Sequence, residues 1–161
     1  MAIIASRIDG RLIHGQVANL WTTKLNIGRI MVVDNEVADS AIDKSGLKLA
    51  TPAGVKLSVL PVEKAAANIL AGKYDSQRVL VIAKRPDRFL ALVEAGVPIE
   101  EINVGNMSQT DNTTSITRSI NVEENDVEDF KKLQEKGVQL VSQMVPSDRA
   151  EDFMRLLNEN M

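Results

Sequence analysis

The feature of this chain that most constrains its fold is a regular alternation of short β-branched runs with longer amphipathic segments. Unbroken apolar runs favour parallel strands that are buried on both faces, and the segments between them carry the apolar spacing of helices. This alternation predicts an α/β fold: a single domain over residues 1–161, with a predominantly parallel open β-sheet and helices on both faces. The predicted strands are 2–8, 29–34, 55–61, 78–83, 101–106 and 138–144; the predicted helices are 14–25, 37–50, 61–72, 86–96, 123–137 and 147–160; residues 113–122 are predicted to form a hairpin.

Two of the predicted helices carry more detailed expectations. The helix 147–160 is expected to begin at Ser147, because a serine hydroxyl is a favourable N-cap. The helix 14–25 is expected to present one apolar face, made of Val17, Leu20, Trp21 and Leu25.

Composition excludes several chemistries. The chain has no cysteine, so disulfides, thiolate catalysis and cysteine-ligated zinc are ruled out. With a single histidine and no paired-ligand motif, no metal site is expected, and no glycine-rich nucleotide-binding motif occurs. The formal net charge of −3 gives no basic field for nucleic acid. No apolar run approaches the ~20 residues of a membrane span, and no signal peptide is evident, so a cytoplasmic protein is expected.

Polar side chains follow the predicted strands at their carboxyl ends, where open α/β sheets bind ligands. The first strand runs into SRIDGRLIHGQV at residues 6–17, which holds the only histidine, His14. Several of these polar residues are cationic, so they predict an anion site rather than an apolar pocket. The predicted set is Arg7, Asp9, Gly10, Arg11, His14, Gly15 and Gln16 around the end of the first strand, and Asp34, Lys84, Asn106 and Ser108 after three later strands.

The residue types in this motif suit a phosphoryl group. An imidazole nitrogen is a nucleophile at neutral pH, and the planar donors of Arg7 and Arg11 match phosphoryl oxygens. A helix that begins at or just after His14 would direct free backbone N–H groups to the same place. Asp9 could either orient a ring nitrogen of His14 or hold one of the arginines. These parts describe a histidine that accepts a phosphoryl group.

The glycines of the motif have a separate expected role. Without a Cβ, Gly10 and Gly15 would let the backbone approach a bound ligand closely.

The residues by themselves leave three other interpretations open. A lone histidine is often structural, and the arginines could be ion-pair partners of Asp9 and nearby carboxylates. A second interpretation is a non-catalytic module that binds phosphate or an acidic partner with the same loop. A third is a phosphate-ester hydrolase with a histidine nucleophile, which would need an acid such as Asp34 or Glu36 to protonate the leaving group.

The segment SRIDGRLIHGQVANLW closely resembles the N-terminal signature of the IIB subunits of the bacterial sugar phosphotransferase system, in the mannose/fructose/sorbose group. The similarity continues along the chain, in the order and spacing of IMVVDNEVADS, VLVIAKRPDRFLALVEAGVP, INVGNM and GVQLVSQMVP. The resemblance therefore covers the whole chain as one IIB domain, and it implies a parallel-rich α/β fold.

The resemblance also implies a function. His14 would accept a phosphoryl group from a phosphohistidine of a IIA protein and pass it to a sugar during uptake through the membrane subunits IIC and IID, with no cofactor. Arg7, Asp9, Arg11 and Gln16 match the motif, with Arg11 expected to stabilise phosphate and Asp9 to orient. The IIB protein would associate with the membrane permease transiently or peripherally.

Two finer expectations follow from the resemblance. The segment 102–120 looks more like the N-acetylgalactosamine branch than the mannose branch. An exposed apolar rim around the loop would suit successive partners, and its candidate residues are Ile13, Trp21 and Met107.

Overall fold

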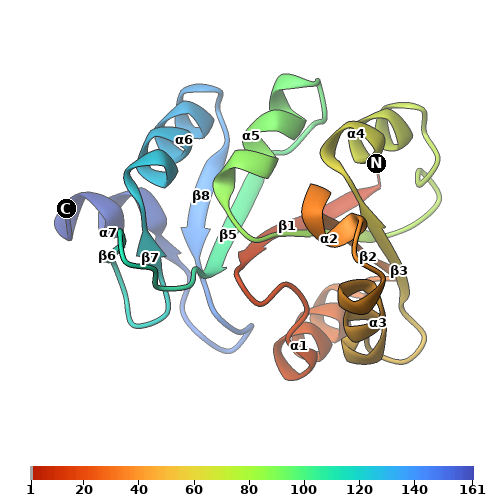
Figure 1. The fold of residues 1–161 in the computed structure, drawn as a ribbon. Helices are drawn as coiled ribbons and strands as arrows, with labels where there is room; N and C mark the ends of the chain where they lie inside the picture. Colours follow the sequence, from red (N-terminus) through yellow and green to blue (C-terminus); the bar gives the residue numbers. More distant parts are fainter. Residues whose placement is uncertain (1) are drawn as a thin grey trace.

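The computed structural model describes residues 2–161. Its centre is a seven-stranded sheet in the order β3-β2-β4-β1-β5-β8-β9 (Figure 1). The first six strands of that order pair in parallel, and β9 is antiparallel to β8. The predicted open parallel sheet is confirmed. The strands are β1 (Ile3–Asp9), β2 (Arg29–Val33), β3 (Lys56–Leu60), β4 (Val79–Ala83), β5 (Glu101–Asn106), β8 (Gln139–Ser142) and β9 (Glu151–Asp152), and the predicted hairpin forms from β6 (Thr114–Ser115) and β7 (Asn121–Val122).

Helices cover both faces of the sheet because its central strands alternate apolar side chains between two cores. In β2, Met31 and Val33 belong to the core beneath α4, α5, α6 and α7, whereas Ile30 and Val32 belong to the core beneath α1, α2 and α3. This alternation explains why the central strands are apolar throughout. The helices are α1 (Gly15–Leu25), α2 (Asn35–Ala38), α3 (Ala41–Ala50), α4 (Val62–Leu70), α5 (Pro86–Glu94), α6 (Glu124–Glu135) and α7 (Phe153–Glu159).

The expected helix 37–50 is two helices, because two caps lie close together in the sequence. The Asp34 carboxylate accepts the backbone N–H groups of Glu36 and Val37 at 3.0 Å and begins α2. The Ser40 hydroxyl accepts the N–H of Asp43 at 3.2 Å and begins α3. A single continuous helix could use only one of these two caps.

The expectations for the C-terminal helix and for Leu20 are wrong. The last helix begins at Phe153 with Asp152 as its cap, since Glu151 and Asp152 first pair with β8. Ser147 lies in the preceding loop. In α1, Trp21 is buried as expected, but Leu20 is 45% exposed and points away from the core.

Asp126 gives a pH-dependent test of the fold. It accepts the N–H of Glu123 at 2.9 Å and the Arg85 guanidinium at 2.5 Å, and burial raises the pKa of Asp126 above 3.8. A carboxyl whose pKa is raised on folding contributes most stability below its unfolded pKa and loses it as pH rises through its folded pKa. We therefore expect the unfolding free energy of the wild type minus that of Asp126→Asn to fall as pH rises above 3.8. Denaturant titrations at a series of pH values measure this difference, and a flat or rising difference would contradict it.

Candidate functional site

The polar motif lies at the topological switch point of the sheet. β1 lies between β4 and β5. The chain leaves β1 into α1 on one face, whereas β4 and β5 lead to helices that belong to the core of the other face. Crossovers that diverge to opposite faces open a crevice at the strand ends. His14 occupies this place as the N-cap residue of α1, as the sequence predicts.

The loop between β1 and α1 is anchored by its apolar residues. Leu12 and Ile13 are buried in the core beneath α1. Leu12 has a positive φ of 60° and donates its N–H to the Asp9 carbonyl at 2.9 Å. A left-handed leucine is costly unless packing fixes it, and such strain is common at functional sites. The anchored turn leaves Arg11 exposed and His14 half-buried on the outer side of the loop.

Asp9 holds both arginines of the motif. The Arg11 side chain contacts the Asp9 carboxylate in a bidentate manner, with Nε at 3.0 Å from Oδ1 and Nη2 at 3.0 Å from Oδ2. The Arg11 backbone N–H adds a third bond to Oδ1 at 2.9 Å. Arg7 Nη2 lies 3.9 Å from Asp9 Oδ2. Of the two roles that the sequence left open for Asp9, the geometry supports holding the arginines.

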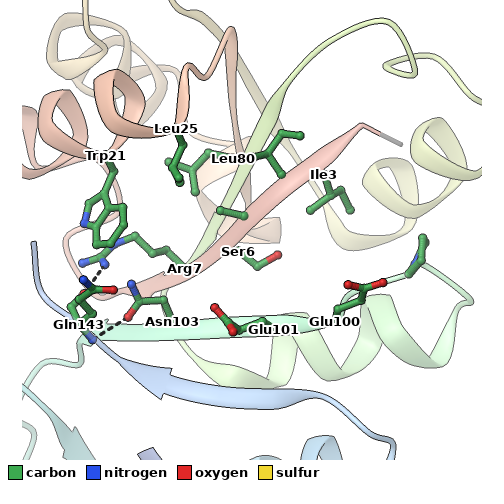
Figure 2. Close-up of a pocket in the computed structure, with 13 residues that line it drawn as sticks. Ile3, Ser6, Arg7, Trp21, Leu25, Leu80, Glu100, Glu101, Asn103 and Gln143 are labelled. Atoms are coloured by element: carbon green, nitrogen blue, oxygen red, sulfur yellow. Dashed lines mark hydrogen bonds between the residues drawn. The ribbon is translucent and has the colours of Figure 1, made fainter. Parts of the chain in front are cut away.

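Arg7 is buried against Trp21. Its guanidinium lies 5.2 Å from the Trp21 ring centroid, a cation–π contact. Arg7 Nη1 donates to the carbonyl of Gln143 at 2.9 Å (Figure 2). Trp21 Nε1 donates to the next carbonyl, of Met144, at 3.0 Å. Burial lowers the pKa of Arg7 to about 10, although Asp9 opposes the shift. Arg7 therefore remains a cation at neutral pH.

Two nitrogens at this site are buried without hydrogen bonds. Over residues 2–161, the buried side-chain nitrogen and oxygen atoms that lack a partner are Arg7 Nη2 and His14 Nδ1. Both residues line the same small cavity of about 10 Å³, together with Asp9 and Trp21. Buried polar groups in folded proteins are almost always paired, so unpaired ones call for an explanation. Here the two atoms lie together at the switch point of the sheet.

β5 brings two of the predicted rim residues to the loop. Gly10 donates its N–H to the Asn106 carbonyl at 2.9 Å. A Cβ on Gly10 would lie 2.7 Å from Ser108 Oγ and 3.3 Å from Asn106 Oδ1. Glycine is therefore required here by the approach of the β5 end, in addition to any approach of a ligand. Gly15 shows no such crowding, since a Cβ there would make ordinary contact with the Ala50 carbonyl at 3.6 Å.

The other predicted site residues lie further out or have structural contacts. Gln16 is exposed on the first turn of α1, and Lys84 is half-buried after β4. Asp34 follows β2, which β4 separates from β1. Its carboxylate caps α2 and lies 3.5 Å from Arg88 Nη2, so these contacts give Asp34 a structural role.

The apolar rim expected around the loop is absent among the residues proposed for it. Ile13, Trp21 and Met107 are all buried. Ile13 and Met107 belong to the two cores, and Trp21 packs over Arg7. None of these three side chains is exposed, so none of them forms an apolar rim.

Gly105 has a role at this site that its place in the sequence does not indicate. The pairing of β1 with β5 shifts register there, since Ile8 pairs with Val104 and Asp9 with Asn106. A Cβ on Gly105 would overlap the guanidinium of Arg7, with Cζ only 2.7 Å away. A glycine inside a strand often marks a close approach of this kind, but the sequence does not say which side chain approaches.

A larger groove meets the site at one end. It has a volume of about 430 Å³ and runs along β1 from Ile3 to Arg7 and Trp21, with Leu25 and Leu80 on one side and Glu100 and Glu101 on the other (Figure 2). His14 lines the small cavity and is not part of this groove. The Arg7–Trp21 pair separates the two.

The crossovers to both faces of a parallel sheet define a doubly wound α/β protein, with a histidine and two arginines at its switch point. Comparison with known proteins identifies its family. The family described as "PTS system sorbose subfamily IIB component" matches residues 3–161. The chain belongs to this family of phosphotransferase-system IIB components, in agreement with the resemblance of its opening motif.

Individual relatives agree with this assignment. The fructose-specific EIIB component of Bacillus subtilis is 36% identical over 157 residues, covering 98% of this chain and 96% of the relative. The mannose-specific EIIAB component of Escherichia coli is 38% identical over 159 residues, covering 99% of this chain but 49% of that longer relative. The crystal structure of the IIBSor domain of the sorbose permease from Klebsiella pneumoniae superposes with a TM-score of 0.95 at 31% identity, covering 100% of this chain and 99% of that one.

Gly105→Ala tests the packing of Arg7. The added methyl group must displace the guanidinium from its place over Trp21, so we expect a loss of about 1–3 kcal/mol in unfolding free energy and a changed Trp21 emission spectrum. Trp21 is the only tryptophan, so the emission reports on this contact alone. Gly28→Ala is the control, because a Cβ there would come no closer than 3.9 Å to another group. Wild-type emission and stability in Gly105→Ala would contradict the described packing.

Proposed function

We propose that this chain is the phosphoryl-carrier subunit of a sugar phosphotransferase system, that residues 1–161 act as a single IIB domain, and that His14 carries the phosphoryl group. One observation carries the proposal: the buried nitrogens of Arg7 and His14 that make no hydrogen bond line one cavity, beside the Asp9–Arg11 pair. A phosphoryl group on the His14 ring supplies the acceptor oxygens that Arg7 Nη2 lacks. Membership of the IIB family supports a role in sugar phosphotransfer.

The first step moves the phosphoryl group onto His14. An unprotonated ring nitrogen of His14 attacks the phosphorus of a phosphohistidine on the IIA donor, in line with the bond that breaks. A new P–N bond forms as the donor P–N bond breaks, and the donor imidazole leaves with the electron pair. Because a histidine replaces a histidine, the bond made is of the same kind as the bond lost, and the protein has only to position the groups and stabilise charge.

Three groups of donors stabilise the transferring phosphoryl. Arg7 Nη2 is buried and makes no hydrogen bond, and Arg11 is held by Asp9 with its side chain partly exposed. The first backbone bond of α1 runs from Ala18 N–H to the His14 carbonyl at 2.8 Å. The N–H groups of residues 15–17 precede that bond and point out of the helix start. Fixed donors of this kind stabilise the charge on the equatorial oxygens without reorganisation.

The second step passes the phosphoryl group to a sugar. A sugar hydroxyl oxygen attacks phosphorus, the P–N bond to His14 breaks, a P–O bond forms and the hydroxyl proton is released. The sugar is held by the membrane subunits IIC and IID. No helix in residues 2–161 is long and apolar enough to cross a membrane. From the family resemblance we propose that the protein acts on the cytoplasmic side, in transient or peripheral contact with the permease.

The acceptor is proposed to be a hexose or a sugar of the N-acetylgalactosamine type. Relatives named for mannose, fructose, sorbose and N-acetylgalactosamine are 38%, 36%, 35% and 34% identical to this chain. The sequence identity to this chain is therefore nearly the same for relatives that are named for four different sugars. This supports the view that the membrane subunits choose the sugar and that the IIB chain carries little of the specificity.

Intact mass spectrometry tests the carrier role. After incubation with phosphoenolpyruvate, enzyme I, the phosphocarrier protein and a IIA protein, we expect one phosphate-sized gain that is acid-labile. The same gain should be absent from His14→Gln. An unmodified wild-type chain beside IIA proteins that are themselves phosphorylated would contradict the carrier role and favour a non-catalytic binding module.

Arg11→Lys tests the contribution of the bidentate arginine. A lysine cannot reproduce the two parallel bonds to Asp9 or present a planar donor pair to phosphate, so we expect the rate of His14 phosphorylation to fall about 10²-fold. Arg88→Lys is the matched control, because Arg88 pairs with Asp87 and Asp34 away from the His14 cavity. Quench-flow with radiolabelled phosphate measures both rates. Equal rates of His14 phosphorylation in the two variants would show that Arg11 does not contribute to the reaction.

A further inference from the structure

The outer face of α3 carries apolar side chains that the fold leaves in solvent. Leu47 is the one residue of this helix that is buried, and it packs into the core beneath α1. On the opposite side of the helix, Ile42 is 85% exposed and Leu49 is 89% exposed. Seven residues separate them, which is nearly two helical turns, so they lie on one stripe.

This stripe is next to the His14 loop. The Ala50 carbonyl at the end of α3 lies 3.6 Å from where a Cβ on Gly15 would be, and Gly15 follows His14. The two helices lie side by side beneath the sheet (Figure 1). On α1, Leu20 points away from the buried Ala18 and Trp21 and is 45% exposed. Leu20, Ile42 and Leu49 together make up what we call the α1–α3 face.

We propose that the α1–α3 face is the docking surface for the protein that donates the phosphoryl group to His14. This inference rests on the proposed function, because it assumes that His14 is phosphorylated by another protein. Exposed apolar side chains that cluster beside a reactive residue are typical of protein interfaces. An interface with an apolar centre and a polar rim, small enough to be transient, suits a partner that must leave after each transfer.

The charges around the face favour the donor over the sugar-holding acceptor. In the unphosphorylated protein, the single carboxylate of Asp9 is shared by Arg7 and Arg11, so the loop is cationic. The donor binds this cationic form and brings a negatively charged phosphoryl group. The acceptor meets the other form, in which the phosphoryl group already offsets the arginines.

Other exposed apolar residues do not form such a cluster at the site. Leu70 is 54% exposed at the end of α4, which packs in the core on the opposite face of the sheet. It therefore serves as a matched control: an exposed leucine on a helix, remote from His14.

The experiment compares a protein donor with a chemical one. The variants are Ile42→Ser/Leu49→Ser as a double substitution, and Leu70→Ser as the control. Each is phosphorylated by a phosphorylated IIA protein that phosphorylates the wild type, and separately by phosphoramidate. In the chemical reaction, the P–N bond of phosphoramidate breaks, a P–N bond to His14 forms and ammonia leaves, so no protein surface is needed. We expect the second-order rate constant with IIA to fall about tenfold or more in the double variant, with an unchanged rate from phosphoramidate and wild-type behaviour in Leu70→Ser.

The other outcomes separate the two claims. An unchanged rate with IIA would overturn the docking proposal and leave the carrier role intact. An equal fall with IIA and phosphoramidate would show that the substitutions act on His14 itself, which also overturns docking. A normal rate with IIA and a loss of transfer from phosphorylated double variant to membranes containing the permease would assign the face to the acceptor instead. If the wild type takes phosphate from neither donor, the proposed function fails and docking fails with it.

Discussion

The site depends on one carboxylate that serves two guanidiniums. Asp9 is buried at the end of β1, and it fixes Arg11 through three hydrogen bonds while offsetting the charge of the buried Arg7. Removing it would leave Arg7 as a buried cation without its ion-pair partner, a change that typically costs 3–5 kcal/mol. The loop depends on the same carboxylate, because Asp9 Oδ1 accepts the backbone N–H of Arg11. The position of Arg11, the charge balance of Arg7 and the shape of the loop therefore all depend on the Asp9 carboxylate.

The position of β1 in the sheet places Asp9, Arg7 and Arg11 at the switch point. Because β1 is flanked by β4 and β5 and its own crossover departs to the opposite face, the loop after it emerges where the crossovers diverge. Leu12 and Ile13 tie the loop to the core beneath α1, and the segment after β8 ties Arg7 and Trp21 through two consecutive carbonyls. The result is a rigid cationic surface beside a half-buried histidine. Such preorganisation suits phosphoryl transfer, in which the protein contributes mainly position and charge.

The sequence predicted those parts of the molecule that arise from local pattern. The parallel sheet follows from apolar runs such as 79–83, and the start of α1 follows from the polar turn before Gly15. Two errors came from competition between neighbouring signals. Ser40 splits an otherwise continuous helical pattern, and residues 151–152 pair with β8 before the last helix can begin. Local periodicity does not show which of two neighbouring caps begins a helix, or whether a segment pairs with a strand instead of joining a helix.

The residues missed at the site share a physical reason. The carbonyls of Gln143 and Met144 belong to the backbone, which every residue has, so their role cannot be seen in the sequence. Gly105 matters because a side chain from another strand approaches it. The expected apolar rim failed for a related reason: whether Met107 or Ile13 faces the core or solvent is decided by the tertiary arrangement, and both are buried. Leu20 was assigned to the apolar face of helix 14–25 because it lies three residues after Val17, at helical spacing, yet it is 45% exposed.

The most direct test of the central claim is a nitrogen–phosphorus NMR measurement on the single imidazole of the chain. With the protein labelled at histidine with ¹⁵N, only His14 contributes ring signals, since the chain has one histidine. On phosphorylation by a IIA protein, one ring nitrogen should shift and show coupling to ³¹P, and that nitrogen identifies the position of the phosphoryl group. Unchanged His14 nitrogens in a chain that has gained a phosphate would place the phosphoryl group on another residue and contradict the account.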